Sequence, residues 1–155
     1  MHPGVARVTE ALRAAGVAGE VVELDTAVRT AQHAATALGV DVGAIANSLV
    51  FLLDGAPVLV LTSGAHRVDT AWLGDRLGGV LRRADADAVR AATGQPIGGV
   101  APVGHPGPLR TVVDRALAAH PVVWAAAGHP NTVFPTTFDE LVTLTDGSPA
   151  DVEPA

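Results

Sequence analysis

The chain has 155 residues, of which 48% are hydrophobic and 17% are charged, and its formal net charge is −6. This length predicts a single domain, and the negative charge argues against a protein that coats nucleic acid. Without cysteine the chain has neither a disulfide framework nor a thiolate nucleophile. Without lysine it has no Walker-type phosphate loop, no Schiff-base residue and no Ser–Lys dyad.

Targeting signals are not visible in the sequence. No apolar run approaches the length that crosses a bilayer, and the first residues lack the basic and apolar segments of a secretory signal. We therefore expect a cytoplasmic protein. Seven arginines and five acidic residues lie between positions 60 and 120, so this stretch allows local phosphate contacts although both ends of the chain are acidic.

Helical and strand patterns alternate along the chain. Apolar residues at helical spacing, with capping residues before them, predict helices over 5–15, 31–39, 69 or 70 to 77, 85–93 and from 137 onward. Short β-branched runs predict strands over 20–25, 48–53, 57–62, 80–82, 109–114, 122–127 and 131–134. A short helix is expected between the strands at 109–114 and 122–127. Asp54-Gly55 predicts a hairpin turn, and Thr137 with Glu140 forms a capping-box pattern.

These elements predict an α+β fold with a mixed, largely antiparallel, barrel-like central sheet and flanking helices. We expect one domain over residues 1–146 and a loose tail over 147–155.

Several catalytic arrangements are absent. The six histidines form no H-x-x-x-H or H-x-H pair, so no metal site is expected. Ser63, His66 and Asp69 are too close in sequence for a triad, and no G-x-S-x-G elbow is present. The pattern instead predicts a strand end at Ser63 and a helix cap at Asp69.

The stretch from Thr93 to Pro108, TGQPIGGVAPVGHPGP, contains five glycines and four prolines. Such a loop either shapes the fold or presents backbone N–H groups to a small polar ligand, and composition alone leaves both alternatives open.

In order along most of the chain, the segments TAQHAATALGV, AIANSLVF, APVLVLTSGAHRVD, ATGQPIGGVAPVGH, VVWAAAGHPNTVF and ELVTLT resemble the YbaK and prolyl-tRNA synthetase editing-domain family. The resemblance implies a deacylase that hydrolyses amino acids wrongly attached to tRNA, most often tRNA for proline. It implies no cofactor. It places the G-x-x-x-P loop of the family on Gly98 to Pro102, as the lip of an aminoacyl pocket.

The resemblance also implies the site residues. Asn47, Gly99 and His129 are the expected catalytic positions, and a side chain at Gly99 is expected to block the ligand without lowering stability. The expected substrate-binding residues are Thr30, Ser48, Gly98, Val100, Ala101, Pro102, His105 and Asn131.

One position departs from the family pattern, because Asn47 stands where the family usually has a lysine. Three interpretations are open: a nearby arginine such as Arg67 or Arg110 replaces it, the substrate differs, or activity is lost.

Three functions remain open at this stage. The first is a trans-editing deacylase for small amino acids (Ala, Ser or Cys) on tRNA for proline. The second is a silent module that binds aminoacyl-tRNA or a synthetase, and the third is a hydrolase of a free ester or amide. The expected partners are the aminoacyl-tRNA acceptor end and prolyl-tRNA synthetase, with neither membrane nor DNA, and the protein is a monomer or a homodimer.

Overall fold

A computed structural model describes residues 2–28 and 30–154. The five α-helices are α1 (Pro3–Ala14), α2 (Ala31–Leu38), α3 (Thr70–Leu77), α4 (Ala86–Thr93) and α5 (Phe138–Thr145). The strands are β1 (Val22–Glu23), β2 (Ile45–Leu53), β3 (Ala56–Ser63), β4 (Leu81–Arg83), β5 (Arg110–Asp114), β6 (Val123–Ala126), β7 (Thr132–Thr136) and β8 (Ser148–Ala150). Two 3-10 helices are η1 (Val42–Ala44) and η2 (Arg115–Ala119).

Helix caps follow the sequence pattern. The side chains of Thr30, Asp69, Asp85 and Thr137 each accept a hydrogen bond from a backbone N–H in the first turn of the following helix. These bonds satisfy donors that have no partner within the helix, which is why helices begin at these residues.

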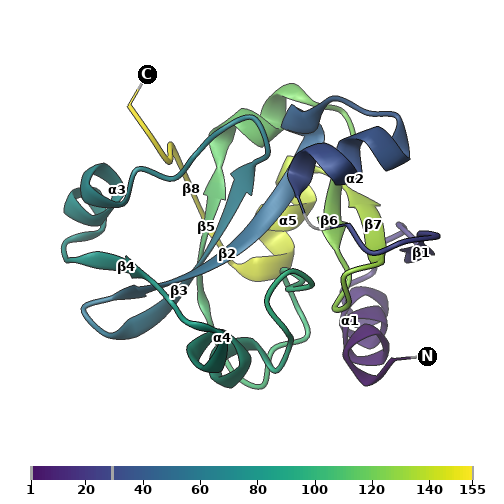
Figure 1. Cartoon of the computed structure of the whole chain (residues 1–155), viewed down its shortest axis with the longest axis horizontal. Coiled ribbons are helices and arrows are strands. Elements are labelled where there is room, and N and C mark those ends of the chain that lie inside the picture. The colour runs from purple at the N-terminus through teal and green to yellow at the C-terminus, as the bar shows by residue number, and fades with distance from the viewer. Residues whose placement is uncertain (1, 29, 155) are drawn as a thin grey trace.

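The long hairpin of β2 and β3 forms the centre of the sheet (Figure 1). Asp54 and Gly55 connect the two strands with positive φ angles of 49° and 87°, which is the backbone that a two-residue hairpin turn requires. The hairpin predicted from Asp54-Gly55 is therefore confirmed.

The α+β class and the mixed sheet are confirmed, but the sheet of the described residues is open rather than barrel-like. Its order is β1-β7-β6-β2-β3-β5-β8, and β4 pairs with β2 outside this path. Four pairings are antiparallel, whereas β2–β6, β3–β5 and β5–β8 are parallel. The expectation of a closed sheet is wrong because β1 and β8 are the two ends of the path.

The segment after residue 146 differs from the loose tail that we expected. Residues Ser148–Ala150 form β8 along β5, Val152 is buried, and the backbone N–H of Asp69 donates to the carbonyl of Val152 at 2.9 Å. A parallel edge pairing depends on a distant strand, so the local composition of this segment did not reveal it.

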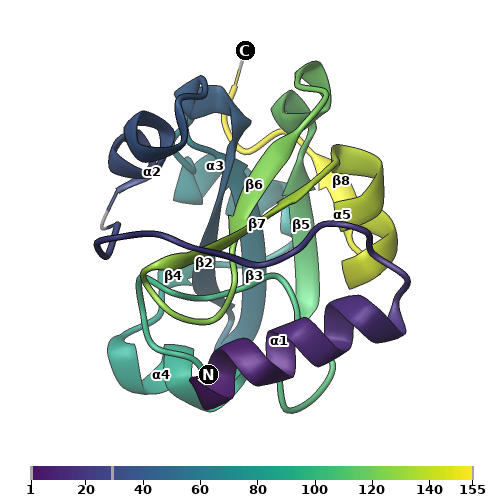
Figure 2. The same cartoon turned by 90° about the vertical axis from the view of Figure 1, so that its right-hand side faces the viewer.

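Apolar residues pack on both faces of the sheet. One cluster lies between the sheet and α1, α4 and α5, and includes Val8, Val50, Val89 and Phe134. A second cluster packs α3 against the opposite face through Phe51 and Leu73. Figure 2 shows α1 along the bottom of the molecule and α5 beside β5 and β8.

Candidate functional site

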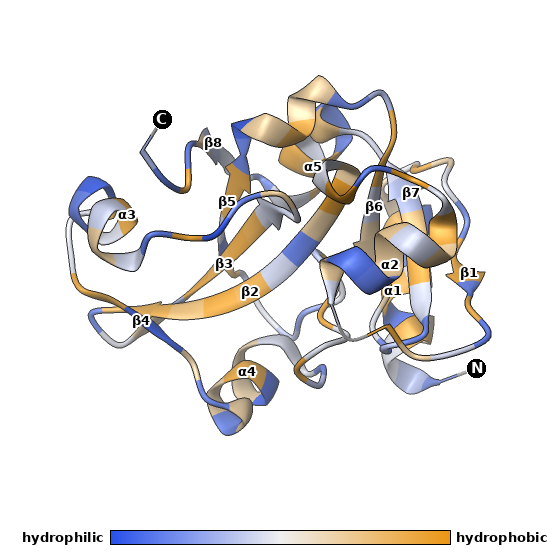
Figure 3. Ribbon diagram, turned by 45° about the horizontal axis from the view of Figure 1, so that its top comes forward, coloured by the Kyte–Doolittle hydropathy of each residue, from blue (hydrophilic) through white to orange (hydrophobic). Residues whose placement is uncertain are grey.

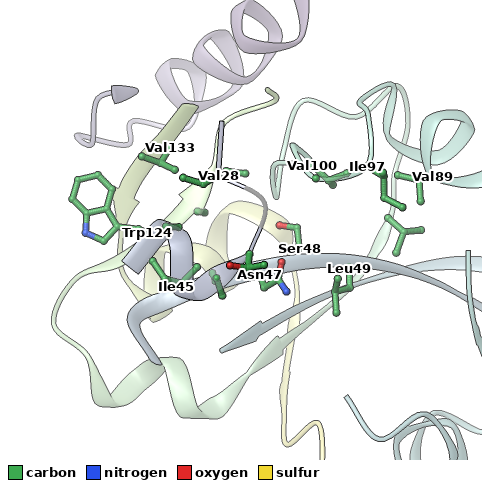
Figure 4. A pocket seen from close by; sticks show the side chains of 18 of the residues that line it. Val28, Ile45, Asn47, Ser48, Leu49, Val89, Ile97, Val100, Trp124 and Val133 are labelled. Carbon is green, nitrogen blue, oxygen red and sulfur yellow. The ribbon is translucent and has the colours of Figure 1, made fainter. Parts of the chain in front are cut away.

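A pocket of about 510 Å³ opens beside β2. Its walls come from the segment before α2 and α2 itself, from β4, α4 and the loop after it, and from β6 and β7. In Figure 4, Val28, Trp124 and Val133 lie on one side of the pocket, and Val89, Ile97 and Val100 lie on the other. Mostly apolar walls around a few polar groups are typical of ligand sites.

The pocket exists because β2 loses its neighbour partway along one edge. On that edge β6 pairs with Ile45 and Ala46, whereas β4 pairs with β2 from Phe51 onward. Within the described part of the chain, no strand pairs with residues 47–49 on this edge, so the sheet has a notch there.

Backbone groups of β2 point into this notch. The N–H of Ala84 donates to the carbonyl of Val50, so even-numbered residues of β2 direct their backbone groups away from β3. Ser48 has the same parity, and its N–H and carbonyl therefore face the notch. The sheet edge thus offers a donor and an acceptor to a bound molecule.

Two polar side chains interrupt the apolar sequence of β2. They are Asn47 and Ser48, and Figure 3 shows a hydrophilic band across the otherwise apolar β2. The hydroxyl of Ser48 is buried and has no hydrogen-bond partner among the described residues, and it points toward the space under Val100 (Figure 4). A buried hydroxyl without a partner is uncommon in proteins, so Ser48 is a candidate ligand contact.

Asn47 and Ser48 point to opposite faces of the sheet, because side chains alternate along a strand. Ser48 shares its face with Ala46 and Val50, which pack in the cluster that also holds Val100. Asn47 shares its face with Leu49 and Phe51, and its side chain is exposed. Both residues line the pocket because the notch opens the sheet edge to both faces.

The loop opposite β2 is held by a glutamine that the sequence analysis did not identify. Gln95 is completely buried. Its side-chain Oε1 accepts from the N–H of Ala101 at 2.6 Å, and its Nε2 donates to the carbonyl of Val103 at 3.1 Å. The loop is therefore ordered around one side chain that satisfies its backbone, and it forms a fixed pocket wall.

The two glycines of the loop have different structural roles. Gly98 has φ +89°, an added Cβ would meet no atom within 4 Å, and the residue lines the pocket. At Gly99 an added Cβ would lie 2.9 Å from the backbone of His129 and Pro130. Unlike the ligand-facing glycine that we expected, Gly99 does not line the pocket, and its lack of a side chain permits the loop to pack closely on the strand connection behind it.

Backbone donors of the loop are partly used. The N–H of Gly99 donates to the carbonyl of Pro96 at 3.1 Å. The N–H groups of Gly98 and Val100 have no acceptor within residues 2–28 and 30–154. Both residues line the pocket, so their N–H groups, rather than that of Gly99, are the candidate donors to a ligand.

The structure brings together five of the expected site residues. Lining the pocket are Thr30, Asn47, Ser48, Gly98 and Val100. The lining does not include Gly99, Ala101, Pro102, His105, His129 and Asn131. Thr30 combines two roles, since its hydroxyl also accepts from the N–H of His33 at 3.0 Å to cap α2.

His129 lies behind the loop and does not line the pocket. Its Nδ1 pairs with the Oδ1 of Asn131 at 2.7 Å, and its ring contacts the ring of His2 with centroids 4.8 Å apart. Because its backbone is the surface on which Gly99 packs, His129 is placed to support the loop.

His105 also supports the loop from outside the pocket. Its Nε2 pairs with the carbonyl of Ala101 at 2.8 Å. Burial lowers the pKa of His105 below its ordinary value of 6.5, although the hydrogen bond to Ala101 acts in the opposite direction. The neutral imidazole is therefore the form that the folded loop favours.

Arginine enters the pocket at a position that we did not expect. Arg67 and Arg110 do not line it, whereas Arg83 on β4 does. The pairing of β4 with β2, which places Arg83 opposite Phe51, comes from the sheet register alone.

The Ser63, His66 and Asp69 stretch forms no triad. Asp69 caps α3, as predicted, and the hydroxyl of Ser63 donates to the carbonyl of Gly43 at 2.9 Å. His66 pairs instead with the buried Asp114 at 3.0 Å, which also accepts from the N–H of Ser63. This network joins the ends of β3 and β5.

In the part of the chain that the structure describes, no group of three or more His, Cys, Asp or Glu side chains is arranged to hold a metal ion. None of the described helices is long and apolar enough to cross a membrane.

The fold and pocket define a small α+β domain with a pocket between an open sheet edge and an ordered loop. Residues 25–144 match the aminoacyl-tRNA editing domain family, and the chain belongs to this family. Membership supports an aminoacyl-tRNA editing role, and deacylation is the activity that the family implies.

Several known proteins are similar to this chain. The uncharacterized protein YwhH of Bacillus subtilis is 31% identical over 79% of this chain and 78% of its own length. A proline–tRNA ligase of Citrifermentans bemidjiense is 33% identical over 57% of this chain but only 16% of its own length. A crystal structure described as a proposed trans-editing enzyme for prolyl tRNA synthetase has a TM-score of 0.93 and 42% identity, covering 100% of this chain and 99% of that chain.

Proposed function

We propose that this protein is a trans-acting editing deacylase that removes small amino acids, of the Ala, Ser or Cys class, from mischarged tRNA for proline. The observation that carries the proposal is the pocket of the family fold, in which an unpaired sheet edge faces a rigid loop with two unused N–H donors. Two relatives support the choice of tRNA. One is a proline–tRNA ligase, and the other is described as a proposed trans-editing enzyme for the corresponding synthetase.

The reaction needs no strong nucleophile from the protein. An aminoacyl ester is already activated, so a positioned water can attack its carbonyl carbon, and the ribose oxygen leaves as the hydroxyl of the terminal adenosine. We assign the N–H groups of Gly98 and Val100 to the oxygen that becomes negative, because donors fixed before the reaction stabilise that charge most effectively. The hydroxyl of Ser48, which has no protein partner, hydrogen-bonds the bound aminoacyl group.

The remaining expected residues act less directly. Asn47 orients the nucleotide side of the substrate by hydrogen bonding, since its side chain faces away from the loop. Thr30 borders the pocket at the start of α2. His129, Gly99 and His105 hold the loop and are positioning residues in this proposal.

The apolar wall limits which amino acid is accepted. Val89, Ile97 and Val100 line the loop side of the pocket, and small side chains fit beside them more readily than large ones. Binding alone separates amino acids of nearly the same shape poorly. The usual solution is a second site that hydrolyses the wrongly attached amino acids small enough to enter it.

A panel of tRNAs for proline charged with Ala, Ser, Cys or Pro tests the proposal. We expect release of at least one small amino acid at a rate well above that without protein, and slower release of proline. Equal rates with and without protein for every member of the panel would refute the deacylase function.

A second candidate function is a module that binds aminoacyl-tRNA without hydrolysing it. It is favoured by Asn47, because the family lysine at this position is associated with activity. Tight binding of charged tRNA without turnover in the same panel would select this candidate.

A further inference from the structure

Among the described residues that line the pocket, one has an ionisable side chain. That residue is Arg83, which is exposed and lies at the end of β4. Within residues 2–28 and 30–154 its guanidinium forms no hydrogen bond and no salt bridge. Its charge is therefore not neutralised by an acidic side chain of the described protein.

The sheet register places Arg83 on the same face as Asn47. Arg83 pairs with Phe51, and directly paired residues of antiparallel strands point to the same face. Phe51 and Asn47 are four residues apart on β2, so they also share that face. The pocket thus has a cation on the face where the sequence lacks the lysine of the family.

The neighbouring arginine offers a natural comparison. Arg82 pairs with Leu52 and consequently points to the opposite face. It is exposed, as Arg83 is, but it does not line the pocket. The two residues share the same strand and the same charge, and they differ in the direction of the side chain.

We propose that Arg83 binds a phosphate of the tRNA acceptor end and supplies the positive charge that Asn47 lacks. This inference rests on the proposed function. An aminoacyl-tRNA carries a positive α-ammonium group and negative phosphates, so a cation at the pocket attracts the phosphates and repels the ammonium. A guanidinium also matches phosphate geometry with two parallel hydrogen bonds.

The position of Arg83 agrees with this role. Arg83 lines the pocket and is exposed, so a phosphate bound to it stays solvated while the aminoacyl group enters the pocket. The other described lining residues are neutral, so Arg83 is the charged group among them that can anchor the nucleotide. The scarcity of charge predicts weak binding with a shallow salt dependence.

The test compares Arg83→Gln with Arg82→Gln in the full chain. Binding of uncharged tRNA for proline is measured over a series of salt concentrations. We expect Arg83→Gln to weaken binding about tenfold, as for loss of one charge-assisted contact. It should also lower the slope of log K against log salt by about 0.7, the value for one phosphate of a single strand. Arg82→Gln should change neither quantity.

A second measurement separates phosphate binding from chemistry. On aminoacyl-adenosine without a phosphate, Arg83→Gln should match the wild type, whereas on mischarged tRNA it should raise KM and leave kcat unchanged. Arg83→Lys should recover most of the salt slope, because it keeps the charge.

Three results would overturn the inference: equal effects of the two glutamine variants, an unchanged salt slope in Arg83→Gln, or an equal loss on the substrate without phosphate. If the wild type hydrolyses no mischarged tRNA, the deacylase proposal fails, and the salt slopes of binding still decide the role of Arg83.

Discussion

Gln95→Met is the substitution that most directly tests whether one side chain holds the loop. Methionine is close to glutamine in length and shape but makes no strong hydrogen bonds. The change leaves the N–H of Ala101 and the carbonyl of Val103 without their partners in a fully buried position. Each buried group left unpaired costs about 1–3 kcal/mol, so we expect a loss of roughly 3 kcal/mol in the free energy of unfolding.

This loss predicts a measurable change in melting temperature. At about 2–4 °C per kcal/mol for a domain of this size, the Tm should fall by about 6–12 °C. Because the same side chain fixes the pocket wall, kcat/KM for deacylation measured well below the new Tm should also fall. A Tm within about 1 °C of the wild type together with unchanged kcat/KM would refute the reasoning.

Three further substitutions or conditions test other parts of the site. Gly99→Val should lower both the Tm and deacylation, because its side chain meets the backbone of His129; a loss of activity with unchanged Tm would indicate a direct ligand contact instead. Asn47→Ala should reduce turnover about tenfold and Asn47→Lys should keep or raise it, whereas indifference to both changes would leave position 47 a purely structural role. Since the pKa of His105 is lowered in the folded state, the unfolded state binds more protons, and the free energy of unfolding should decrease as the pH falls from 6.5 through the folded pKa. Denaturant unfolding at several pH values measures this dependence. His105→Gln is the control, and it should flatten the slope of the unfolding free energy against pH.

The local elements of the fold were predictable from the sequence because their causes are local. Thr30, Asp69 and Thr137 cap helices within three residues of their partners, and the turn at Asp54-Gly55 is specified by its own backbone preference. The order of the sheet was not predictable in this way, since it depends on strands that meet across the whole chain. The pairing of β8 with β5 and the open sheet edge beside Asn47 both belong to this class.

The site was predictable where the family resemblance fixed a position, and less so where packing decides. The resemblance identified Ser48, Gly98 and Val100, which line the pocket. It did not separate the pocket-facing Gly98 from the packing Gly99, because two adjacent glycines look alike in sequence. Gln95 could have been noticed as a lone amide within the loop, whereas Arg83 becomes visible only once the register of β4 is known.

The central claim is that an aminoacyl end binds between the open edge of β2 and the glycine-containing loop. An NMR titration of the ¹⁵N-labelled protein with a non-hydrolysable aminoacyl-adenosine analogue tests it most directly. We predict that the largest changes in amide signals occur at Ser48, Gly98 and Val100, with smaller changes at Asn47. Changes that cluster elsewhere, for example along β8 at the end of the sheet, while these amides remain unaffected, would contradict the claim.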